Sequence, residues 1–294
     1  MSNTKISTKF LKIIIFISLT ILIISSLISF YIMGNIKKDT QRILGNKIEI
    51  KLENKINNSL QLGVTNAVSI ANNQNIQDAL INNDKEKAYQ ILNNLNNKYS
   101  KFTKHKKSKI HIHTYDVKSF LRSWDKTHNG DELSSFRETI NYVKETQQPV
   151  LDIEVGWANL VIRSIVPIIK DEKYIGSLEF IQDFESIQKA LENEDKYFFA
   201  LIDKKLLKNK PTKEHIIDKY AISQSYYKRD FFKTLKTVDL DNLIKQGYIS
   251  KDNKYFSIKP IIGFDSSFIG YYVIGEDYEK IKEIINQSQN ITKK

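Results

Sequence analysis

The hydrophobic pattern of the chain begins with one long apolar run near the amino terminus. Residues 13–33 read IIIFISLTILIISSLISFYIM and carry no charge. A helix of this length spans roughly 30 Å, which is the thickness of a bilayer's hydrocarbon core. No small-x-small cleavage site follows the run, so the pattern favours an uncleaved transmembrane anchor over a cleaved signal peptide.

Helical periodicity continues directly from this run. Ile36, Ile43 and Ile50 are seven residues apart, and apolar residues then recur at steps of three and four. No proline interrupts the stretch. The pattern therefore predicts a stalk helix over residues 34–73. A similar periodicity over 75–102 predicts one or two further helices packed on the stalk.

The period then changes from helical to alternating. In KIHIHTYD, Ile110 and Ile112 fall on one face of a strand, and His111 and His113 fall on the other. SFLRSW predicts a second short strand. NGDE predicts a turn, and SSFRETINYVKET predicts a helix that Ser134 caps.

Three more strands and a repeat complete an α+β pattern. PVLDIEVG, NLVIRSIVPIIK and KYIGSLEFIQDF predict consecutive antiparallel strands, and ESIQKALENED predicts a closing helix. PIIKDEKYIGSLEFIQDFESI at 167–187 then matches PIIGFDSSFIGYYVIGEDYEKI at 260–281. Because each copy reads as a β-hairpin that leads into a helix, the repeat predicts two similar antiparallel sheet domains in tandem.

These patterns predict six consecutive parts. We expect a cytoplasmic tail over 1–12, the anchor over 13–33, the stalk over 34–73, a larger sheet domain over 74–194, a smaller one over 195–276, and over 277–294 a helix that returns toward the membrane. Basic residues flank the anchor on both sides, so the charge rule is nearly balanced. A short tail usually stays in the cytoplasm, so we expect a single-pass protein of the cytoplasmic membrane with most of its chain in the periplasm.

Composition removes several classes of function. The net charge is +11, and five lysines that flank the apolar run contribute to it. The basic run KYSKFTKHKKSK at 98–109 is interpreted as a solvated helix end and loop, so no nucleic-acid partner is expected. The absence of cysteine excludes disulfides, thiolate zinc sites and cysteine nucleophiles. The chain also has no Gly-x-Ser-x-Gly, Walker or His-Glu-x-x-His motif, so no enzyme is expected.

The stretches SFLRSWDKTHNGDELSSFRETI and EVGWANLVIRSIVPIIKDEKYIGSLEF resemble the double Cache sensory domains of bacterial receptors. The similar variety is double Cache domain 3, which occurs in chemotaxis proteins, sensor kinases and diguanylate cyclases, and the likeness covers nearly all of 35–290. It implies two tandem PAS-like sheet domains, a membrane-distal one and a membrane-proximal one. Trp157 and Asn159 depart from the pattern of this family, whose members usually carry small or basic residues and a glycine there. The chain ends at NQSQNITKK without an output module, so we expect either the input half of a split or truncated receptor or a chain that couples to a separate signalling partner.

Three arginines dominate the candidate chemistry. Arg122, Arg137 and Arg163 come from segments that converge if 109–183 forms one sheet, and an arginine fork holds a carboxylate bidentately. The structural alternative for each is a salt bridge, with Arg137–Asp131 as one pairing. Trp124 and Trp157 would form an apolar or cation–π wall of the pocket. Acidic side chains would bind an amine of the solute or neutralise the arginines. The predicted ligand-binding residues are Arg122, Trp124, Arg137, Arg163, Asp131, Trp157, His113 and Glu179.

The histidine pair raises the question of a metal. His111 and His113 face the same way on one strand, as two metal ligands would. No third ligand stands at a supporting spacing, and such a pair is usually a polar strand face. We therefore expect neither a metal nor a cofactor.

The sequence thus predicts an extracytoplasmic sensory domain that binds a small carboxylate or amino-acid-like solute. Binding would change how a sheet packs on the stalk helix and so pass the state to the membrane. Parallel stalk helices predict a homodimer. The alternative is a membrane-anchored solute-binding or scaffold protein that presents its ligand to a separate partner.

Overall fold

The computed structural model of the chain describes residues 8–102, 108–156, 159–224 and 226–279, together with 281 and 283. Trp157, part of the basic run and most of the expected returning helix lie outside the described residues. The helices are α1 (Thr8–Ala71), α2 (Gln74–Ile81), α3 (Lys85–Phe102), α4 (Glu138–Thr146), α5 (Glu185–Glu192), α6 (Arg229–Leu235) and α7 (Leu240–Gln246). The strands are β1 (Lys109–Thr114), β2 (Ser119–Arg122), β3 (Val150–Val155), β4 (Leu160–Lys170), β5 (Lys173–Gln182), β6 (Lys196–Asp203), β7 (Ile216–Ile217), β8 (Tyr220–Ile222), β9 (Tyr248–Lys251), β10 (Lys254–Ile262) and β11 (Phe268–Asp277).

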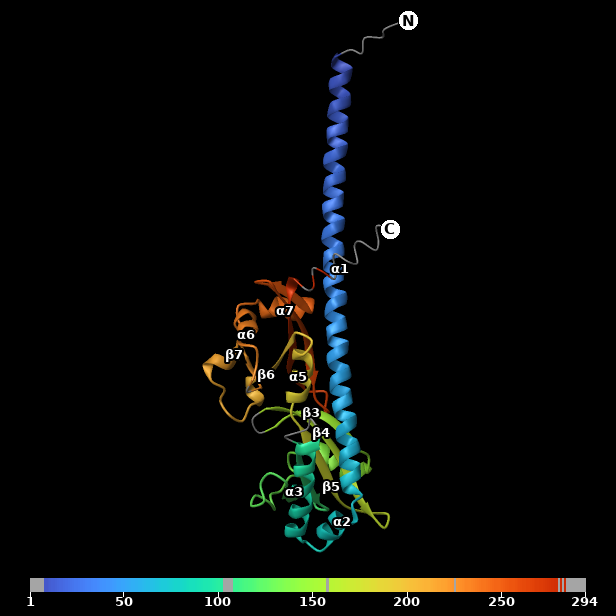
Figure 1. Cartoon of the computed structure of the whole chain (residues 1–294), viewed down its shortest axis with the longest axis vertical. Helices are drawn as coiled ribbons and strands as arrows, with labels where there is room; N and C mark the ends of the chain where they lie inside the picture. The colour runs from blue at the N-terminus through green and yellow to red at the C-terminus, as the bar shows by residue number, and fades with distance from the viewer. Residues whose placement is uncertain are drawn as a thin grey trace.

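Helix α1 is a single helix of 64 residues that joins the expected anchor and stalk. Its amino-terminal half projects alone from the molecule, and both sheets lie along its other half (Figure 1). An 18-residue window within it has a mean hydropathy of 2.7 and is not buried at all, so α1 has the length and composition to cross a membrane.

The first sheet is antiparallel, in the order β2-β1-β5-β4-β3. The expected alternation of β1 is confirmed. Ile110 and Ile112 belong to a core that α1, α2 and α3 share with this sheet. His111 and His113 lie on the opposite face, where α4 packs through Ile140. Helices α1, α2 and α3 thus cover the apolar face, and the polar side chains lie on the other face, together with α4.

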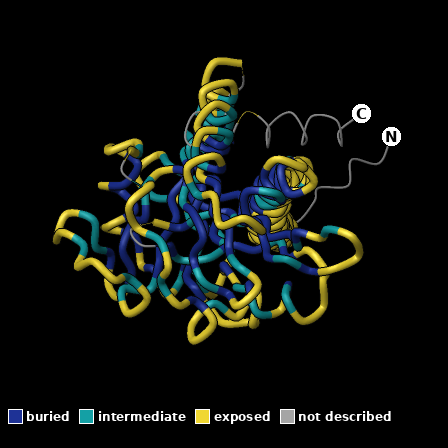
Figure 2. The backbone as a smooth tube through the Cα atoms, turned by 90° about the horizontal axis from the view of Figure 1, so that it is seen from below, coloured by how far each residue is buried: buried dark blue, intermediate teal, exposed yellow. Residues whose placement is uncertain are grey.

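The second sheet has the order β7-β8-β6-β11-β10-β9. One face packs on α1 and α5 through residues such as Phe198 and Ile274, and the other packs on α6 and α7 through residues such as Phe199 and Val273. Figure 2 shows buried backbone running through the centre of the molecule, with exposed loops around it. The α+β prediction is confirmed.

The sequence repeat corresponds to two hairpins with the same irregularity. β4–β5 and β10–β11 each shift register once, at Ile168/Ile169 and at Ile261/Ile262. A Cβ added at Gly176 would collide with a backbone carbonyl of β1, and one at Gly270 would collide with a backbone carbonyl of β6. Glycine is therefore required where a neighbouring strand passes close to each hairpin.

Two local predictions are wrong. Helix α4 starts only at Glu138, and its N-cap residue Arg137 makes no side-chain cap bond. The hydroxyl of Ser134 instead donates to Glu132 at 2.7 Å. The reason is that Leu133 is buried and the turn after it must bring Arg137 over the sheet before the helix begins. The second strand is also shorter than SFLRSW, because β2 ends at Arg122.

Candidate functional site

Strand pairing brings the polar side chains of the first sheet onto one face. His111 lies opposite both Glu179 of β5 and Arg122 of β2. Arg163 of β4 lies opposite Asp152 of β3. Because directly paired residues point to the same side, residues far apart in the sequence share one polar surface beneath α4.

Glu179 is the centre of this surface. Its Oε1 accepts hydrogen bonds from Arg137 Nη2 at 2.6 Å and from Arg163 Nη1 at 2.5 Å. Glu154 supports the same two arginines, with its Oε2 3.1 Å from Arg163 Nε and 3.6 Å from Arg137 Nη2. The Glu179 side chain is fully buried, and the two arginine side chains are 13% and 11% exposed. Two buried cations are thus balanced by two carboxylates.

The electrostatics of the cluster follow from that balance. Burial alone would raise the pKa of Glu179, but Arg137 and Arg163 hold it well below its usual value. Burial also lowers the pKa of His111 and, further, that of His113. The face therefore carries an ionised carboxylate beside two neutral imidazoles.

A cleft of about 380 Å³ opens at one edge of this face. Arg137 at the start of α4 and Glu154 of β3 line one side of it, and Phe264 and Asp265 line it from the turn between β10 and β11. The backbone N–H of Phe264 faces the Asp152 carboxylate and lowers its pKa, so the two sheets meet across the cleft. The volume is in the range of pockets that hold small metabolites.

Replacing Asp152 with asparagine is expected to stabilise the protein near neutral pH and to have little effect near pH 4. Burial raises the pKa of Asp152 from 3.8 to about 6, with Glu154 and Asp265 adding to the rise. The folded state therefore keeps a proton that the unfolded state releases, and stability falls as pH rises through this window. The cost reaches at most about 3 kcal/mol above pH 6, since one pKa unit corresponds to about 1.4 kcal/mol.

Thermal unfolding of both proteins across this pH range measures the effect. Asparagine keeps a side-chain oxygen of the same size facing the Phe264 N–H, so the contact with the β10–β11 turn is kept in the variant. Besides the two acids, Arg163 of β4 and Tyr272 of β11 face Asp152 and are unchanged in the variant. Parallel pH profiles for the two proteins would show that the Asp152 carboxyl does not titrate in this window.

Arg122 and Asp131 form a separate ion pair. Nη1 and Nη2 of Arg122 donate to Asp131, at 2.9 and 2.5 Å, and Nη1 also donates to the backbone carbonyl of His128 at 2.6 Å. This contact lowers the pKa of Asp131 to about 2. The alternative pairing of Asp131 with Arg137 is therefore wrong. Trp124 is 42% exposed and packs edge-on against His111, with ring centroids 5.8 Å apart.

The structure thus brings four of the eight predicted residues into one cluster, namely Arg137, Arg163, His113 and Glu179. Arg122, Asp131 and Trp124 lie beside it, and Trp157 lies outside the described residues. Asp152 and the β10–β11 turn were missed. The two copies of the repeat differ at this turn, which reads GFDSS in the second copy and KDEK in the first. That difference could have marked the turn, but nothing in the local sequence indicates that it contacts the first sheet.

Solved structures with a similar chain path are sensory domains. The V. cholerae histidine kinase DctB sensor domain is 11% identical, with 80% of this chain and 97% of that chain covered and a TM-score of 0.47. The ligand-binding domain of the Pseudomonas fluorescens chemoreceptor CtaA, in complex with L-isoleucine, is 14% identical over 85% and 98%, with a TM-score of 0.45. The sensory domain of the Campylobacter jejuni chemoreceptor Tlp3, with isoleucine bound, is 15% identical over 84% and 94%, with a TM-score of 0.48.

A comparison with curated proteins gives no match. The family comparison is decisive, because one family model matches residues 45–280 and so covers more than half of the chain. That range contains most of α1 beyond the apolar run and both sheets. The chain belongs to the family described as the double sensory domain of two-component sensor kinases, dCache_3.

Proposed function

We propose that this chain is the extracytoplasmic sensory part of a bacterial signal-transduction or chemotaxis receptor and that it binds a small carboxylate or amino-acid-like solute. Family membership supports the sensory role. The observation that carries the ligand class is the position of Arg137, a buried guanidinium at the wall of a 380 Å³ cleft that also holds acidic side chains.

The cleft suits a ligand with both charges. The solute carboxylate pairs with Arg137, whose contact with Glu154 is long at 3.6 Å and is therefore the easiest of its ion pairs to replace. The carboxylates of Asp152 on β3 and of Asp265 on the β10–β11 turn line the same cleft and take an amine. A solute without an amine uses the arginine alone. Glu179, which also bonds Arg163, holds the Arg137 guanidinium in place.

Packing connects the cleft to the stalk helix. Ile153 of β3 and Ile269 of β11 both line the cleft. The same two side chains belong to the core that contains Leu44, Ile48 and Leu52 of α1. A solute that changes the spacing of the two sheets therefore changes their packing on α1, and a helix displacement of roughly an ångström or two carries the state along it.

The membrane arrangement follows the same proposal. Residues 13–33 form the anchor in the cytoplasmic membrane, and the sheets lie in the periplasm. The first sheet packs at the end of α1 farthest from the apolar run, so it forms the membrane-distal domain and the second sheet forms the membrane-proximal one (Figure 1). Helix α1 carries the state from the sheets to the membrane.

Thermal unfolding of the full chain in detergent, with a panel of amino acids and organic acids, tests the proposal. A solute at a hundredfold its dissociation constant adds about 2.7 kcal/mol of stability. Arg137→Lys is expected to weaken this solute at least tenfold, because lysine keeps a positive charge for Glu179 but loses the bidentate fork. Arg229→Lys, a matched change at an exposed arginine of α6, is expected to leave binding unchanged. A shift that survives Arg137→Lys, or no shift with any compound, would remove the proposed ligand class.

A further inference from the structure

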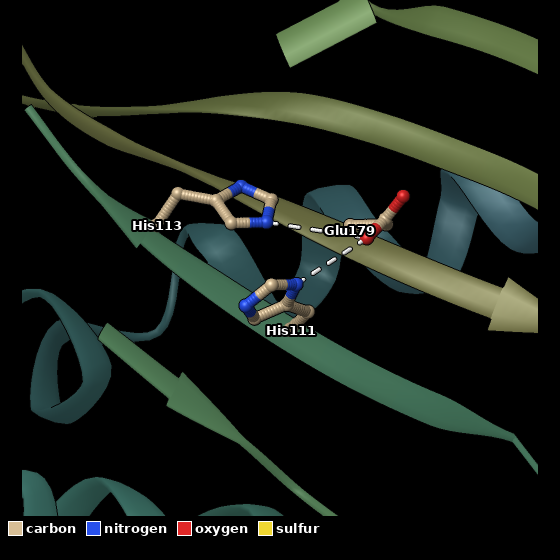
Figure 3. A group of neighbouring side chains, drawn as sticks. All are labelled: His111, His113 and Glu179. Atoms are coloured by element: carbon tan, nitrogen blue, oxygen red, sulfur yellow. Dashed lines mark ion pairs between the residues drawn. The ribbon is translucent and has the colours of Figure 1, made fainter. Parts of the chain in front are cut away.

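Three buried side chains on the polar face of the first sheet point toward one another (Figure 3). His111 and His113 come from β1, and Glu179 comes from the adjacent strand β5. His111 Nδ1 lies 3.5 Å from Glu179 Oε2, and His113 Nε2 lies 3.9 Å from the same oxygen. All three atoms lie within 4.8 Å of one another, and the side chains are only 4%, 0% and 0% exposed.

Two of these atoms have no hydrogen-bond partner among the described residues, namely His113 Nε2 and Glu179 Oε2. A buried polar atom left in this way costs free energy, so its persistence needs an explanation. The separations are too long for good hydrogen bonds. They are close to the spacing of ligand atoms around one ion, because ligands held tetrahedrally by Zn²⁺ at 2.0–2.2 Å lie roughly 3.4 Å apart, and a small contraction of the three side chains would reach it.

The outer contacts of the three residues already fix their orientation. His111 Nε2 lies 2.8 Å from the Ser119 hydroxyl, and His113 Nδ1 lies 2.8 Å from the Ser177 hydroxyl. In the tautomer that an ion requires, each serine oxygen accepts the outward ring proton, and the inward nitrogen keeps its lone pair for the ion. The other oxygen of Glu179 is held by the two arginines described above. Metal ligands are characteristically supported by such a second layer of hydrogen bonds.

We propose that His111, His113 and Glu179 form a binding site for a divalent transition-metal ion of the zinc class. Two imidazole nitrogens and one carboxylate oxygen are the ligand set of such ions, with a fourth position open to water or an anion. Glu154 and Glu179 offset the charges of the neighbouring arginines, so the ion meets two neutral imidazoles without uncompensated positive charge from the protein. None of the three residues lines the solute cleft, but Glu179 also bonds Arg137 at 2.6 Å, so the two sites are neighbours.

Sequence reasoning missed the third ligand because strand pairing supplies it. Glu179 is far from His111 along the chain but directly opposite it in the sheet. Trp124 covers the site through its contact with His111, so its fluorescence provides a local signal of ion binding.

Calorimetric titration of ZnCl₂ into the full chain in detergent, after treatment with a chelator, tests the proposal. We expect one zinc per chain, binding at least a hundredfold weaker in His113→Gln, and binding about tenfold weaker in Ser177→Ala, which removes only an outer contact. His128→Gln is the control, because His128 also faces a carboxylate, Asp131 at 3.8 Å, but is 67% exposed. It is expected to bind zinc like the unmodified protein.

A second readout covers the case in which His113→Gln does not fold. Co²⁺ bound by the unmodified chain should give the intense visible absorption of a four-coordinate ion and should quench fluorescence that Trp124→Phe removes. Absence of zinc binding, binding that is lost in His128→Gln but kept in His113→Gln, or a weak six-coordinate Co²⁺ spectrum would each overturn the proposal. None of these outcomes bears on solute binding, which is measured separately through Arg137.

Discussion

Replacing Glu179 with glutamine is expected to lower the free energy of unfolding by about 3 kcal/mol or more. Arg137 and Arg163 both donate to one oxygen of this carboxylate, and its side chain is fully buried. Glutamine removes the charge and leaves Glu154 alone to balance two guanidinium groups. Breaking a buried ion pair by removing one partner is costly because the remaining charge cannot recover its hydration.

Denaturant unfolding of the full chain in detergent measures this loss, with circular dichroism as the signal. The matched control is Glu185→Gln, which breaks an ion pair with Lys189 whose side chains are 66% and 40% exposed. Exposed pairs contribute little, so the control should change stability by less than about 1 kcal/mol. If both variants unfold alike, Glu179 does not hold the two arginines in the way described.

A cysteine at position 43 is expected to cross-link most of the protein into covalent dimers on oxidation. Ile36, Ile43 and Ile50 are 41%, 54% and 55% exposed and lie on the face of α1 opposite its buried residues. Isoleucine at seven-residue spacing is typical of the pairing positions of parallel two-stranded coiled coils. Neighbouring positions such as Asn46 and Lys47 are polar, so the contact is narrow and a covalent trap is the appropriate measurement.

The chain offers a clean background for this experiment because it has no cysteine. Ile43→Cys and Ile50→Cys are compared with Ile81→Cys, which replaces an isoleucine that is 53% exposed on α2, beyond the carboxyl-terminal end of α1. A disulfide needs Cβ atoms about 3.5–4.5 Å apart, so only residues at a dimer contact form it efficiently. Equal cross-linking at positions 43, 50 and 81 would remove the support for a stalk-mediated dimer.

Much of the fold follows from periodicity. The alternation of Ile110 and His111 predicts both the strand and its two faces, because one face must pack on helices while the other carries polar groups. The repeat predicts two hairpins, because each needs glycine where a neighbouring strand passes closely. The start of α4 was placed too early, because the burial of Leu133 and the reach of Arg137 outweigh the capping preference of Ser134.

The site was predictable only in part. Residue type identified Arg137 and Arg163 as candidates to bind a carboxylate, but not which carboxylates of the protein they contact. That choice depends on strand register, which places Glu179 between them and gives Arg122 to Asp131. The role of Asp152 depends on a contact with a turn from the second sheet, and no local pattern reports it.

The most direct test of the account is a crystal structure with the solute that gives the largest thermal shift. The account predicts that the solute occupies the cleft between the first sheet and the β10–β11 turn. Its carboxylate should lie within hydrogen-bonding distance of the Arg137 guanidinium, and any amine should lie beside Asp152 or Asp265. A solute bound elsewhere, or one in the cleft with its carboxylate turned away from Arg137, would contradict the account.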